Sequence, residues 1–349
     1  MKLGIMTAAR TNNFGTDLQA YAMQKVFGKY SDAEIIDYVC PKLENSHKLL
    51  NGVSLIGLIY LPWKIYKNIS HFLFRKKYFK KSRKYTVDNV HEIKYDAVVV
   101  GSDQIWNLDI TGNDMNFFLP FEGPAKYAYA ASIGKEDIRH WQEKYNLKKY
   151  LDDFLKISVR EASGVDVLKG IGVDADYHLD PILMLDKDEW TELATRKTLA
   201  KYVFVYLIQK NDEAIRYAKK YATENGLKVV VFQSPGKYRK GIRKCVYCDV
   251  VRWISYMNNA DMIITNSYHG LSMAIALERN FRVFGIKNSV QNNSRMENLV
   301  KNTELESFMY VDKADGNYEC PDWENVRQKL KCLQEKSLKY IKEITQNQQ

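Results

Sequence analysis

Short β-rich runs alternate with helical stretches along the 349 residues, and this rhythm limits the possible folds more than any other feature of the sequence. Lys2–Thr7 and Glu34–Tyr38 read as strands, with a helix expected over Thr16–Phe27 between them. Further strands are expected at Ala97–Val100, Ala125–Ala131, Ile157–Val159 and Tyr177–Leu179. Strands and helices that alternate in this way predict parallel sheets covered by helices.

The rhythm restarts after Asp180 and Pro181, which indicates a second domain. Strands are expected at Tyr202–Ile208, Lys228–Phe232, Met262–Thr265 and Arg282–Gly285, with helices over Asp212–Asn225, Asp249–Asn258 and Tyr268–Glu278. We therefore expect an α/β protein of two Rossmann-like, doubly wound domains facing a cleft, over residues 1–181 and 182–322. The helical periodicity also predicts a C-terminal helix within residues 323–349 and one long helix over residues 136–154.

The composition indicates a soluble, cytoplasmic protein. Hydrophobic residues make up 46% and charged residues 27% of the chain, as in ordinary globular domains. Arg10 interrupts the N-terminus too early for a secretory signal, and no run reaches the roughly 18 apolar residues of a spanning helix. The five cysteines, an odd number, do not suggest a disulfide framework. Cys245 and Cys248 form a CxxC pair, which we interpret as reduced thiols because a zinc site needs two more ligands.

The net charge of +10 is concentrated in an insert at residues 45–87. This insert, expected to form two helices, contains ten cations and no acidic residue, and the 42 Lys and Arg residues outside it balance 42 Asp and Glu. Such a patch favours an anionic surface, so Lys64–Lys84 is the candidate for peripheral contact with the inner face of a membrane. A solvated basic helical face is the alternative. No nucleic-acid recognition motif is present, and nucleic acid is not an expected partner.

In open α/β sheets, ligands bind in the loops that follow the strands. The first such loop contains Asn13, Phe14 and Gly15, and the helix start behind it offers backbone N–H groups to an anion. It has neither the lysine of a phosphate-binding P-loop nor a GxGxxG pattern, so ATP and dinucleotides are not indicated. A similar turn occurs in many strand–helix connections, so this signal is weak alone.

The loop after Ala97–Val100 carries polar side chains and an indole in the run GSDQIWN. Asp103, Gln104 and Asn107 suit the hydroxyls of a sugar, and Trp106 could stack on its apolar face. An aspartate that caps a turn is the alternative for Asp103.

Two arginines follow predicted strands or begin predicted helices. Arg160 is the third residue of the run SVRE, and Arg295 lies at an apparent helix start. A guanidinium in such a place can bind a carboxylate or phosphate through two hydrogen bonds. For Arg160 an ion pair with Glu161 or another acid is the alternative.

The strongest candidate is the loop after Met262–Thr265, which contains Asn266, Ser267, His269 and Gly270. A lone histidine is more often structural than catalytic. His269, however, follows a buried strand, begins a helix and lies among hydroxyl and amide side chains. That position suits proton transfer or anion binding.

Taken in order, these blocks resemble the polysaccharide pyruvyl transferase family. The resemblance covers about Met1 to Lys301 and includes NFG with LQA, GSDQIWN, SVRE, the Asp180-Pro181 pair, NSYHG and NSRMENL. It implies a GT-B-like fold of two Rossmann-like domains, with the acceptor in the N-terminal domain and the donor in the C-terminal domain. One departure is Ser267, because family members often have an arginine at that position.

The resemblance implies a transferase that moves the enolpyruvyl group of phosphoenolpyruvate onto two hydroxyls of a hexose and releases phosphate. The acceptor would be a polysaccharide precursor for exopolysaccharide or capsule, or a polyprenyl-pyrophosphate-linked oligosaccharide. His269 would act as acid or phosphate ligand, Asp103 as base, and Arg160 and Arg295 as anion ligands. No cofactor is implied, and no His cluster or DxD indicates a metal.

Three other functions remain open from the sequence. A GT-B-type glycosyltransferase that uses a nucleotide sugar is the first, because a fold does not determine a function. A non-catalytic assembly protein is the second, although the set of Asp103, Arg160 and His269 disfavours it. A reductase-associated relative, suggested only by Cys245 and Cys248, is the third.

Overall fold

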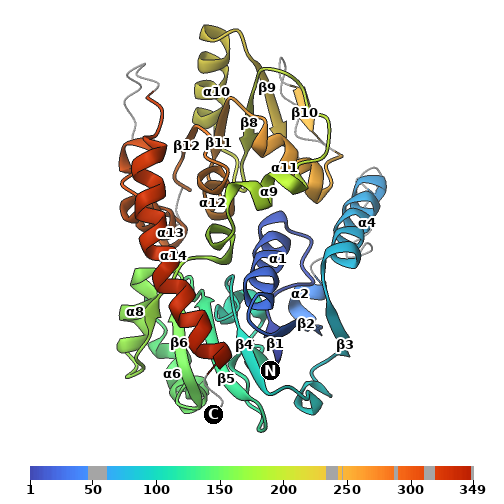
Figure 1. Cartoon of the computed structure of the whole chain (residues 1–349), viewed down its shortest axis with the longest axis vertical. Helices are drawn as coiled ribbons and strands as arrows, with labels where there is room; N and C mark the ends of the chain where they lie inside the picture. Colours follow the sequence, from blue (N-terminus) through green and yellow to red (C-terminus); the bar gives the residue numbers. More distant parts are fainter. Residues whose placement is uncertain (46–60, 233–242, 246, 287–289, 310–318, 347–349) are drawn as a thin grey trace. The chain divides into compact units, whose positions relative to one another are not determined.

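The computed structural model describes residues 1–45, 61–232, 243–245, 247–286, 290–309 and 319–346. The chain forms two compact units (Figure 1). The first comprises the described residues of 1–48, 75–184 and 331–349, and the second those of 49–74 and 185–330. No helix among the described residues is long and apolar enough to cross a membrane.

The first unit is built on a seven-stranded sheet in the order β3-β2-β1-β4-β5-β6-β7. All neighbouring strands are parallel. The strands are β1 (Lys2–Met6), β2 (Asp32–Tyr38), β3 (Lys81–Tyr85), β4 (Ala97–Val100), β5 (Ala125–Ala131), β6 (Phe154–Val159) and β7 (Asp176–Tyr177). The strand order reverses between β1 and β4, and in doubly wound sheets ligands bind outside the carboxyl ends at that switch point.

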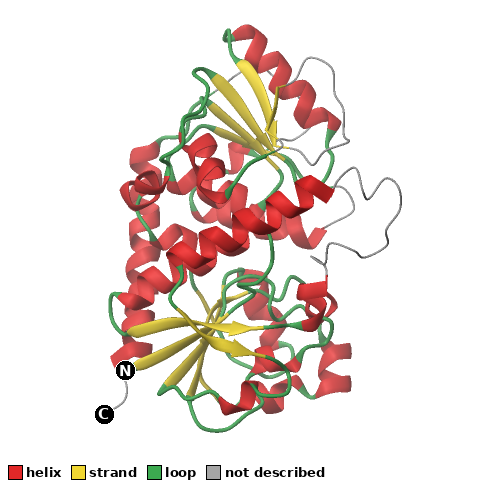
Figure 2. Cartoon of the chain, turned by 90° about the vertical axis from the view of Figure 1, so that its right-hand side faces the viewer, coloured by secondary structure: helices red, strands yellow, loops and turns green. Residues whose placement is uncertain are grey.

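Helices join these strands and flank the sheet (Figure 2). The α-helices of this unit are α1 (Phe14–Gly28), α2 (Pro41–Asn45), α5 (Leu108–Thr111), α6 (Arg139–Tyr145), α7 (Leu147–Leu151) and α8 (Ala162–Lys169). Single 3₁₀ turns occur at η1 (Val90–Glu92), η2 (Met115–Phe118) and η3 (Pro181–Met184). Two longer helices, α4 (Leu61–Tyr78) and α14 (Trp323–Gln346), each contribute residues to both units.

The second unit repeats the plan on a smaller parallel sheet, in the order β10-β9-β8-β11-β12. Its strands are β8 (Tyr202–Tyr206), β9 (Lys228–Phe232), β10 (Arg243–Cys245), β11 (Met262–Thr265) and β12 (Phe281–Val283). Its helical segments are α9 (Lys187–Leu193), α10 (Asp212–Glu224), α11 (Val250–Asn258), α12 (Tyr268–Ala276), α13 (Val290–Asn302) and η4 (Glu306–Phe308). The predicted α/β class with parallel sheets is thus confirmed.

One predicted helix is wrong, and one strand was not predicted. The single helix expected over residues 136–154 is two helices, because Asn146 adopts a left-handed φ of 50° and ends α6. The insert contains a strand that was not predicted, β3 (Lys81–Tyr85), which pairs with β2. Helix α4 is one of the two helices expected in the insert, and residues 46–60 of the insert, including Lys48, lie outside the described residues.

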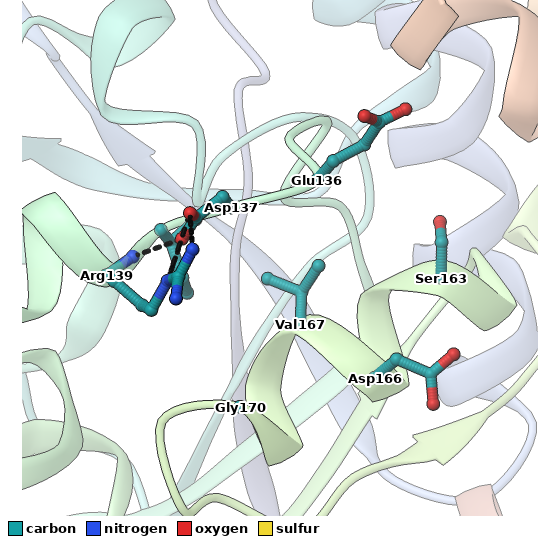
Figure 3. Close-up of a pocket in the computed structure, with 8 residues that line it drawn as sticks. Glu136, Asp137, Arg139, Ser163, Asp166, Val167 and Gly170 are labelled. Carbon is teal, nitrogen blue, oxygen red and sulfur yellow. Dashed lines mark hydrogen bonds and ion pairs between the residues drawn. The ribbon is translucent and has the colours of Figure 1, made fainter.

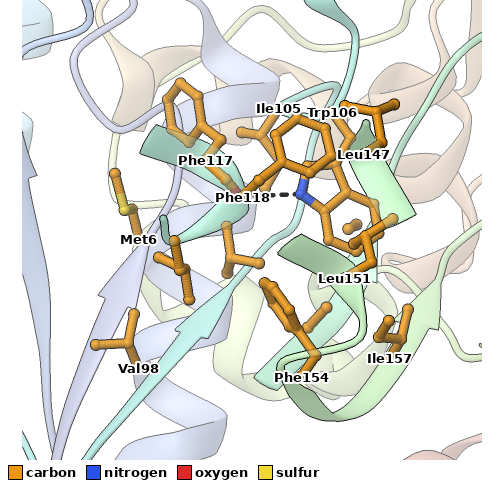
Figure 4. Packing of buried hydrophobic residues seen from close by; sticks show 14 of the residues in the cluster. Met6, Val98, Ile105, Trp106, Phe117, Phe118, Leu147, Leu151, Phe154 and Ile157 are labelled. Carbon is orange, nitrogen blue, oxygen red and sulfur yellow. Dashed lines mark hydrogen bonds between the residues drawn. The ribbon is translucent and has the colours of Figure 1, made fainter. Parts of the chain in front are cut away.

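Trp106 belongs to the hydrophobic core of the first unit (Figure 4). Its side chain is 2% exposed, and its indole N–H donates to the backbone oxygen of Phe117 at 2.9 Å. Phe118 stacks on its ring at 5.6 Å and Phe154 meets it edge-on at 6.0 Å. The ring therefore has no free face for a sugar, and its amphipathic character serves the core.

Candidate functional site

Two groups of predicted site residues lie in different units, and each is described by itself. The first lies at the carboxyl ends of β4, β6 and β7 in the seven-stranded sheet. Gly101 begins the loop after β4 with a φ of 137°, and a Cβ there would lie 1.9 Å from the backbone oxygen of Tyr129. Only glycine fits this approach, so the loop can turn directly off the strand and bring Asp103 over the sheet edge.

Arg160 is the centre of this first group. Its side chain is fully buried, with Nη1 at 2.8 Å from Asp180 Oδ2 and Nη2 at 3.3 Å from Asp103 Oδ1. The ion pair that the sequence left open is therefore made with Asp180 and Asp103. An anionic ligand could reach this guanidinium only by displacing one of those carboxylates, so a direct role as an anion ligand is disfavoured.

Asp103 is held from several directions but keeps some exposure. Thr16 of α1 donates its hydroxyl to Asp103 Oδ2 at 2.7 Å, and the Gln104 N–H donates to Oδ1 at 2.9 Å. The Asp103 backbone has a φ of 68°, a left-handed conformation that aspartate tolerates better than most residues. Its side chain is 17% exposed, whereas those of Arg160 and Asp180 are fully buried. Of these three side chains, that of Asp103 is the one that a substrate can reach.

Buried polar contacts connect the cluster to β1 and α1. Gln19 donates to the Thr7 hydroxyl at 2.9 Å and accepts from the Ser102 N–H at 3.2 Å. The Ser102 hydroxyl lies 3.1 Å from Asp180 Oδ2 and 2.9 Å from the Ala130 oxygen. Because buried polar groups are costly to leave unpaired, this network fixes the geometry around Asp103.

The predicted loop residues 13–15 form the start of α1. Asn13 is the N-cap and accepts from the Gly15 N–H at 2.9 Å, while Phe14 and Gly15 are buried. This cap satisfies one of the backbone donors that the helix start offers. Thr16, one residue further on, contacts Asp103 and is not among the residues predicted for the site.

Gln104 and Asn107 lie beside the loop that follows β5. The Asn107 side chain caps α5 and donates to the Gly134 oxygen at 3.4 Å. The Gln104 amide lies against Gly134, where a Cβ would be 1.9 Å from Gln104 Nε2. Gly134 has a φ of 57°, so glycine is favoured there on both grounds.

Glu161 is a second residue of the site that is not among the predicted ones. Its buried Oε1 accepts from the Ser132 hydroxyl at 2.9 Å and from the N–H groups of Ile133 and Gly134 at 2.9 and 3.1 Å. Glu161 therefore shapes the loop that carries Gly134, next to Gln104. Its place directly after Arg160 in the SVRE run was the signal for it.

The second group of predicted residues lies between β11 and α12. Asn266 bridges to the loop after β8, accepting from the Ile208 N–H at 2.9 Å and donating to the Gln209 oxygen at 2.9 Å. Ser267 is the N-cap of α12 and accepts from the Gly270 N–H at 3.3 Å. A Cβ on Gly270 would lie 2.4 Å from Thr265 Oγ1, so glycine lets α12 pack closely on the end of β11.

His269 is the second residue of α12 and is partly exposed. Its ring lies 5.5 Å from that of Tyr268, which is itself 7% exposed. The Arg295 guanidinium lies over the same Tyr268 ring, 5.7 Å from its centre. Arg295 lies within α13, in its second turn and not at its start as expected. Tyr268 thus links His269 and Arg295, which the sequence predicted separately.

A separate cavity of about 420 Å³ lies in the first unit, between the start of α6 and α8 (Figure 3). Asp137 and Arg139 are hydrogen-bonded to each other at its wall, and Asp166 and Val167 face it from α8. The residues that line it are Glu136, Asp137, Ile138, Arg139, Ser163, Asp166, Val167 and Gly170. None of the predicted site residues is among them.

The described residues contain no group of three or more His, Cys, Asp or Glu side chains that could hold a metal ion. Cys40, Cys248, Cys320 and Cys332 are not part of a disulfide bond.

Solved structures with a similar fold include enzymes that act on nucleotide sugars. UDP-GlcNAc 2-epimerase from Neisseria meningitidis, solved with UDP-GlcNAc, has a TM-score of 0.52 at 10% identity, covering 99% of this chain and 94% of that chain. E. coli ADP-heptose LPS heptosyltransferase II has a TM-score of 0.42 at 10% identity, over 96% and 99%. Phytolacca americana UGT2 has 0.45 at 11% identity, over 98% and 94%. At such identities the likeness to the epimerase shows the fold alone. No curated protein sequence matches this chain.

The chain is thus an α/β protein of two Rossmann-like units, with a GT-B-like fold. Within that class it belongs to the polysaccharide pyruvyl transferase family, whose family model matches residues 13–288. The match includes both groups of predicted site residues except Arg295.

Proposed function

We propose that the protein is a ketal pyruvyl transferase that moves the enolpyruvyl group of phosphoenolpyruvate onto two hydroxyls of a hexose. The acceptor is a polysaccharide precursor, which in the lipid-linked case is a polyprenyl-pyrophosphate oligosaccharide. The observation that carries this proposal is family membership together with an accessible carboxylate, Asp103, held over a sheet edge by Arg160 and Thr16.

The reaction replaces the phosphate ester of the donor with two sugar ethers. Protonation of the methylene carbon makes the neighbouring carbon electrophilic, one hydroxyl oxygen adds to it, and the carbon–oxygen bond to phosphate breaks. The second hydroxyl then adds to the same carbon and closes the ring. Of the two hydroxyl protons, one balances the new methyl group and the other leaves with phosphate. The chemistry needs an acid, a base for the hydroxyls and cations for the donor.

We assign these roles to the two groups separately. Asp103 is the base that orients and deprotonates an acceptor hydroxyl, with Arg160 as its positioning residue. His269 is the acid or phosphate ligand, and its place in the first turn of α12 favours an anion beside it. Arg295 supplies a positive charge in the same unit, and its guanidinium packs over the Tyr268 ring. With Ser267 where family members often have arginine, Arg295 is the main cation of this group.

A glycosyltransferase that uses a nucleotide sugar is the second candidate. Its support is the fold likeness to an epimerase whose structure contains UDP-GlcNAc. Fold likeness carries little weight for function, so the donor decides between the two.

Titration with phosphoenolpyruvate and with a panel of nucleotide sugars, followed by thermal unfolding, tests the donor. A ligand at 100 times its dissociation constant adds about 2.7 kcal/mol of stability. We expect phosphoenolpyruvate to stabilise the wild type and to lose that effect in Arg295→Ala, with phosphate released once a suitable acceptor is added. Stabilisation by nucleotide sugars alone would overturn the proposal in favour of glycosyl transfer. The exposed Arg216 gives a matched control, Arg216→Ala, which should respond as the wild type.

A further inference from the structure

The helix α4 presents an apolar face to solvent. Ile65, Ile69, Phe72 and Leu73 are 38%, 51%, 57% and 55% exposed. Their spacing of four, three and one residues places all four on one side of a helix. Figure 1 shows α4 in light blue. A surface helix normally turns its polar side chains outward, so this arrangement needs a reason.

The opposite side of α4 already supplies the contacts that hold the helix. Ser70, His71 and Phe74 are buried, and on a helical wheel they lie opposite Ile65 and Ile69. The outward apolar side chains are therefore additional to those that α4 uses for packing. A contiguous exposed apolar patch of this kind marks an interaction surface.

The charge of α4 identifies the kind of partner. The helix sequence contains no acidic residue, and the exposed Lys76 and Lys77 accompany the apolar face. Two such helices would bring like charges together, which disfavours a second copy of the chain as the partner. An anionic lipid surface accepts both the apolar side chains and the cations.

The structure also narrows the membrane contact that the sequence placed at Lys64–Lys84. Arg75 donates to the backbone oxygens of Ala9 and Thr11, each at 3.1 Å, and is held within the fold. Three cations in and next to β3 are paired with acids in the first unit. These pairs are Lys80 with Asp32, Lys81 with Asp37 and Arg83 with Glu92. The charge of these three cations is largely compensated. Within Lys64–Lys84, α4 is therefore the better candidate for the membrane contact, because it combines exposed apolar side chains with exposed lysines.

We propose that α4 binds the surface of an anionic bilayer. Ile65, Ile69, Phe72 and Leu73 enter the boundary between headgroups and acyl chains, and the lysines contact the phosphates. A helix of this kind lies in the plane of the interface and does not cross the membrane. The inference goes beyond pyruvyl transfer and does not depend on which donor the enzyme uses.

Cosedimentation with vesicles of phosphatidylcholine and phosphatidylglycerol tests the apolar contribution. We expect Phe72→Ser/Leu73→Ser to lower the partition coefficient at least about tenfold, since each buried side chain contributes substantially. The side chains are exposed, so the fold should persist. Leu155 and Ile208, which are 64% and 54% exposed elsewhere, provide matched controls as Leu155→Ser and Ile208→Ser. These should bind as the wild type, and an equal loss in the controls would overturn the proposal.

A charge series tests the second part of the surface. Lys76→Gln/Lys77→Gln should weaken binding about tenfold at low ionic strength, and pure phosphatidylcholine vesicles should bind poorly. The paired residues give the matched control, Lys80→Gln/Lys81→Gln, which should bind nearly as the wild type. Equal loss in both pairs would overturn the assignment to α4.

The remaining outcome concerns a protein partner. If Phe72→Ser/Leu73→Ser changes the oligomeric state and leaves vesicle binding intact, the apolar face belongs to a second copy and the proposal fails. Phosphate release with a water-soluble acceptor should stay at the wild-type level in all these variants. Loss of vesicle binding is thereby distinguished from failure of the proposed transferase activity.

Discussion

The cluster around Asp103 and the loop around His269 differ in charge and in how their polar groups are used. In the first, two carboxylates share one guanidinium, which leaves an excess of negative charge. In the second, residues 265–270 contain no acid, and His269 and Arg295 are both side chains that can carry positive charge. The first cluster suits a neutral polyol, whose hydroxyls donate to carboxylates, and the second suits an anion.

The two groups also differ in how rigid and how accessible their key side chains are. Arg160 and Asp180 are fully buried, and their geometry is fixed by protein contacts before a substrate arrives. His269 is partly exposed at a helix start. We therefore expect substitutions in the first cluster to affect stability together with activity, and substitution of His269 to affect activity alone.

The largest expected effect is on turnover in His269→Ala. If His269 is the acid or phosphate ligand, the rate of phosphate release should fall about 10²–10⁴-fold, while the unfolding midpoint changes little because the side chain is partly exposed. Steady-state phosphate release and thermal unfolding measure the two. A rate within about threefold of the wild type would show that the reaction does not use this histidine.

Arg160→Met should have the largest effect on stability. It leaves Asp103 and Asp180 without their counter-ion, and breaking a buried pair in this way costs about 3–5 kcal/mol. Urea unfolding measures this loss, and Asp180→Asn in the same chain should recover part of it by removing the uncompensated charge. Arg295→Met, which loses a cation–π contact with Tyr268, should cost about 0.5–2 kcal/mol. Equal costs for the two arginines would contradict the contrast between the clusters.

Much of this contrast could be predicted from the sequence. The runs of buried residues placed β4, β5 and β11 within one residue, because short apolar strands bounded by polar turns leave a clear periodic signal. The rule that ligands follow parallel strands then selected Asp103, Arg160 and His269. The contacts that join the members of each cluster had no signal in the local sequence. Asp180 lies 20 residues from Arg160 along the chain, and the strand order decides that they meet.

Trp106 and Arg295 show two further limits of sequence reasoning. A tryptophan beside polar residues looks the same whether its ring faces a ligand or the core, and here Phe118 and Phe154 enclose it. Arg295 was expected at a helix start because an asparagine pair precedes it. The helix begins earlier, at Val290, and so Arg295 reaches Tyr268 from the second turn.

The buried His178 makes the stability of the first unit depend on pH. Burial lowers the pKa of His178 to about 4 from 6.5, with Lys336 adding to the effect, so the unfolded chain binds a proton that the folded chain excludes. The stabilisation is present in full above pH 6.5 and is lost as the pH falls toward 4, on the order of 3 kcal/mol. Urea unfolding as a function of pH measures it, and His178→Gln should flatten the slope in that window. An unchanged slope would show that other groups cause it.

The smallest expected effect comes from removing the Thr16 hydrogen bond to Asp103 while its ion pair with Arg160 stays in place. Thr16→Val removes the hydroxyl that donates to Asp103 Oδ2 at 2.7 Å and leaves the ion pair with Arg160 in place. A hydrogen bond to a charged group contributes about 1.5–3 kcal/mol, of which partial exposure of Asp103 should recover some through water. We expect the lower end of that range in stability, together with an altered pH profile of turnover, because the lost donor favoured the ionised carboxylate.

Thr111→Val is the matched control for that substitution. Its buried hydroxyl donates to the backbone oxygen of Asn107 at 3.2 Å, away from Asp103, so it should cost about 1 kcal/mol and leave the pH profile as it was. If both variants shift the profile equally, Thr16 acts through the fold in general. If Thr16→Val alone shifts it, Asp103 is the titrating base, and the first cluster contributes to the chemistry as well as to the scaffold.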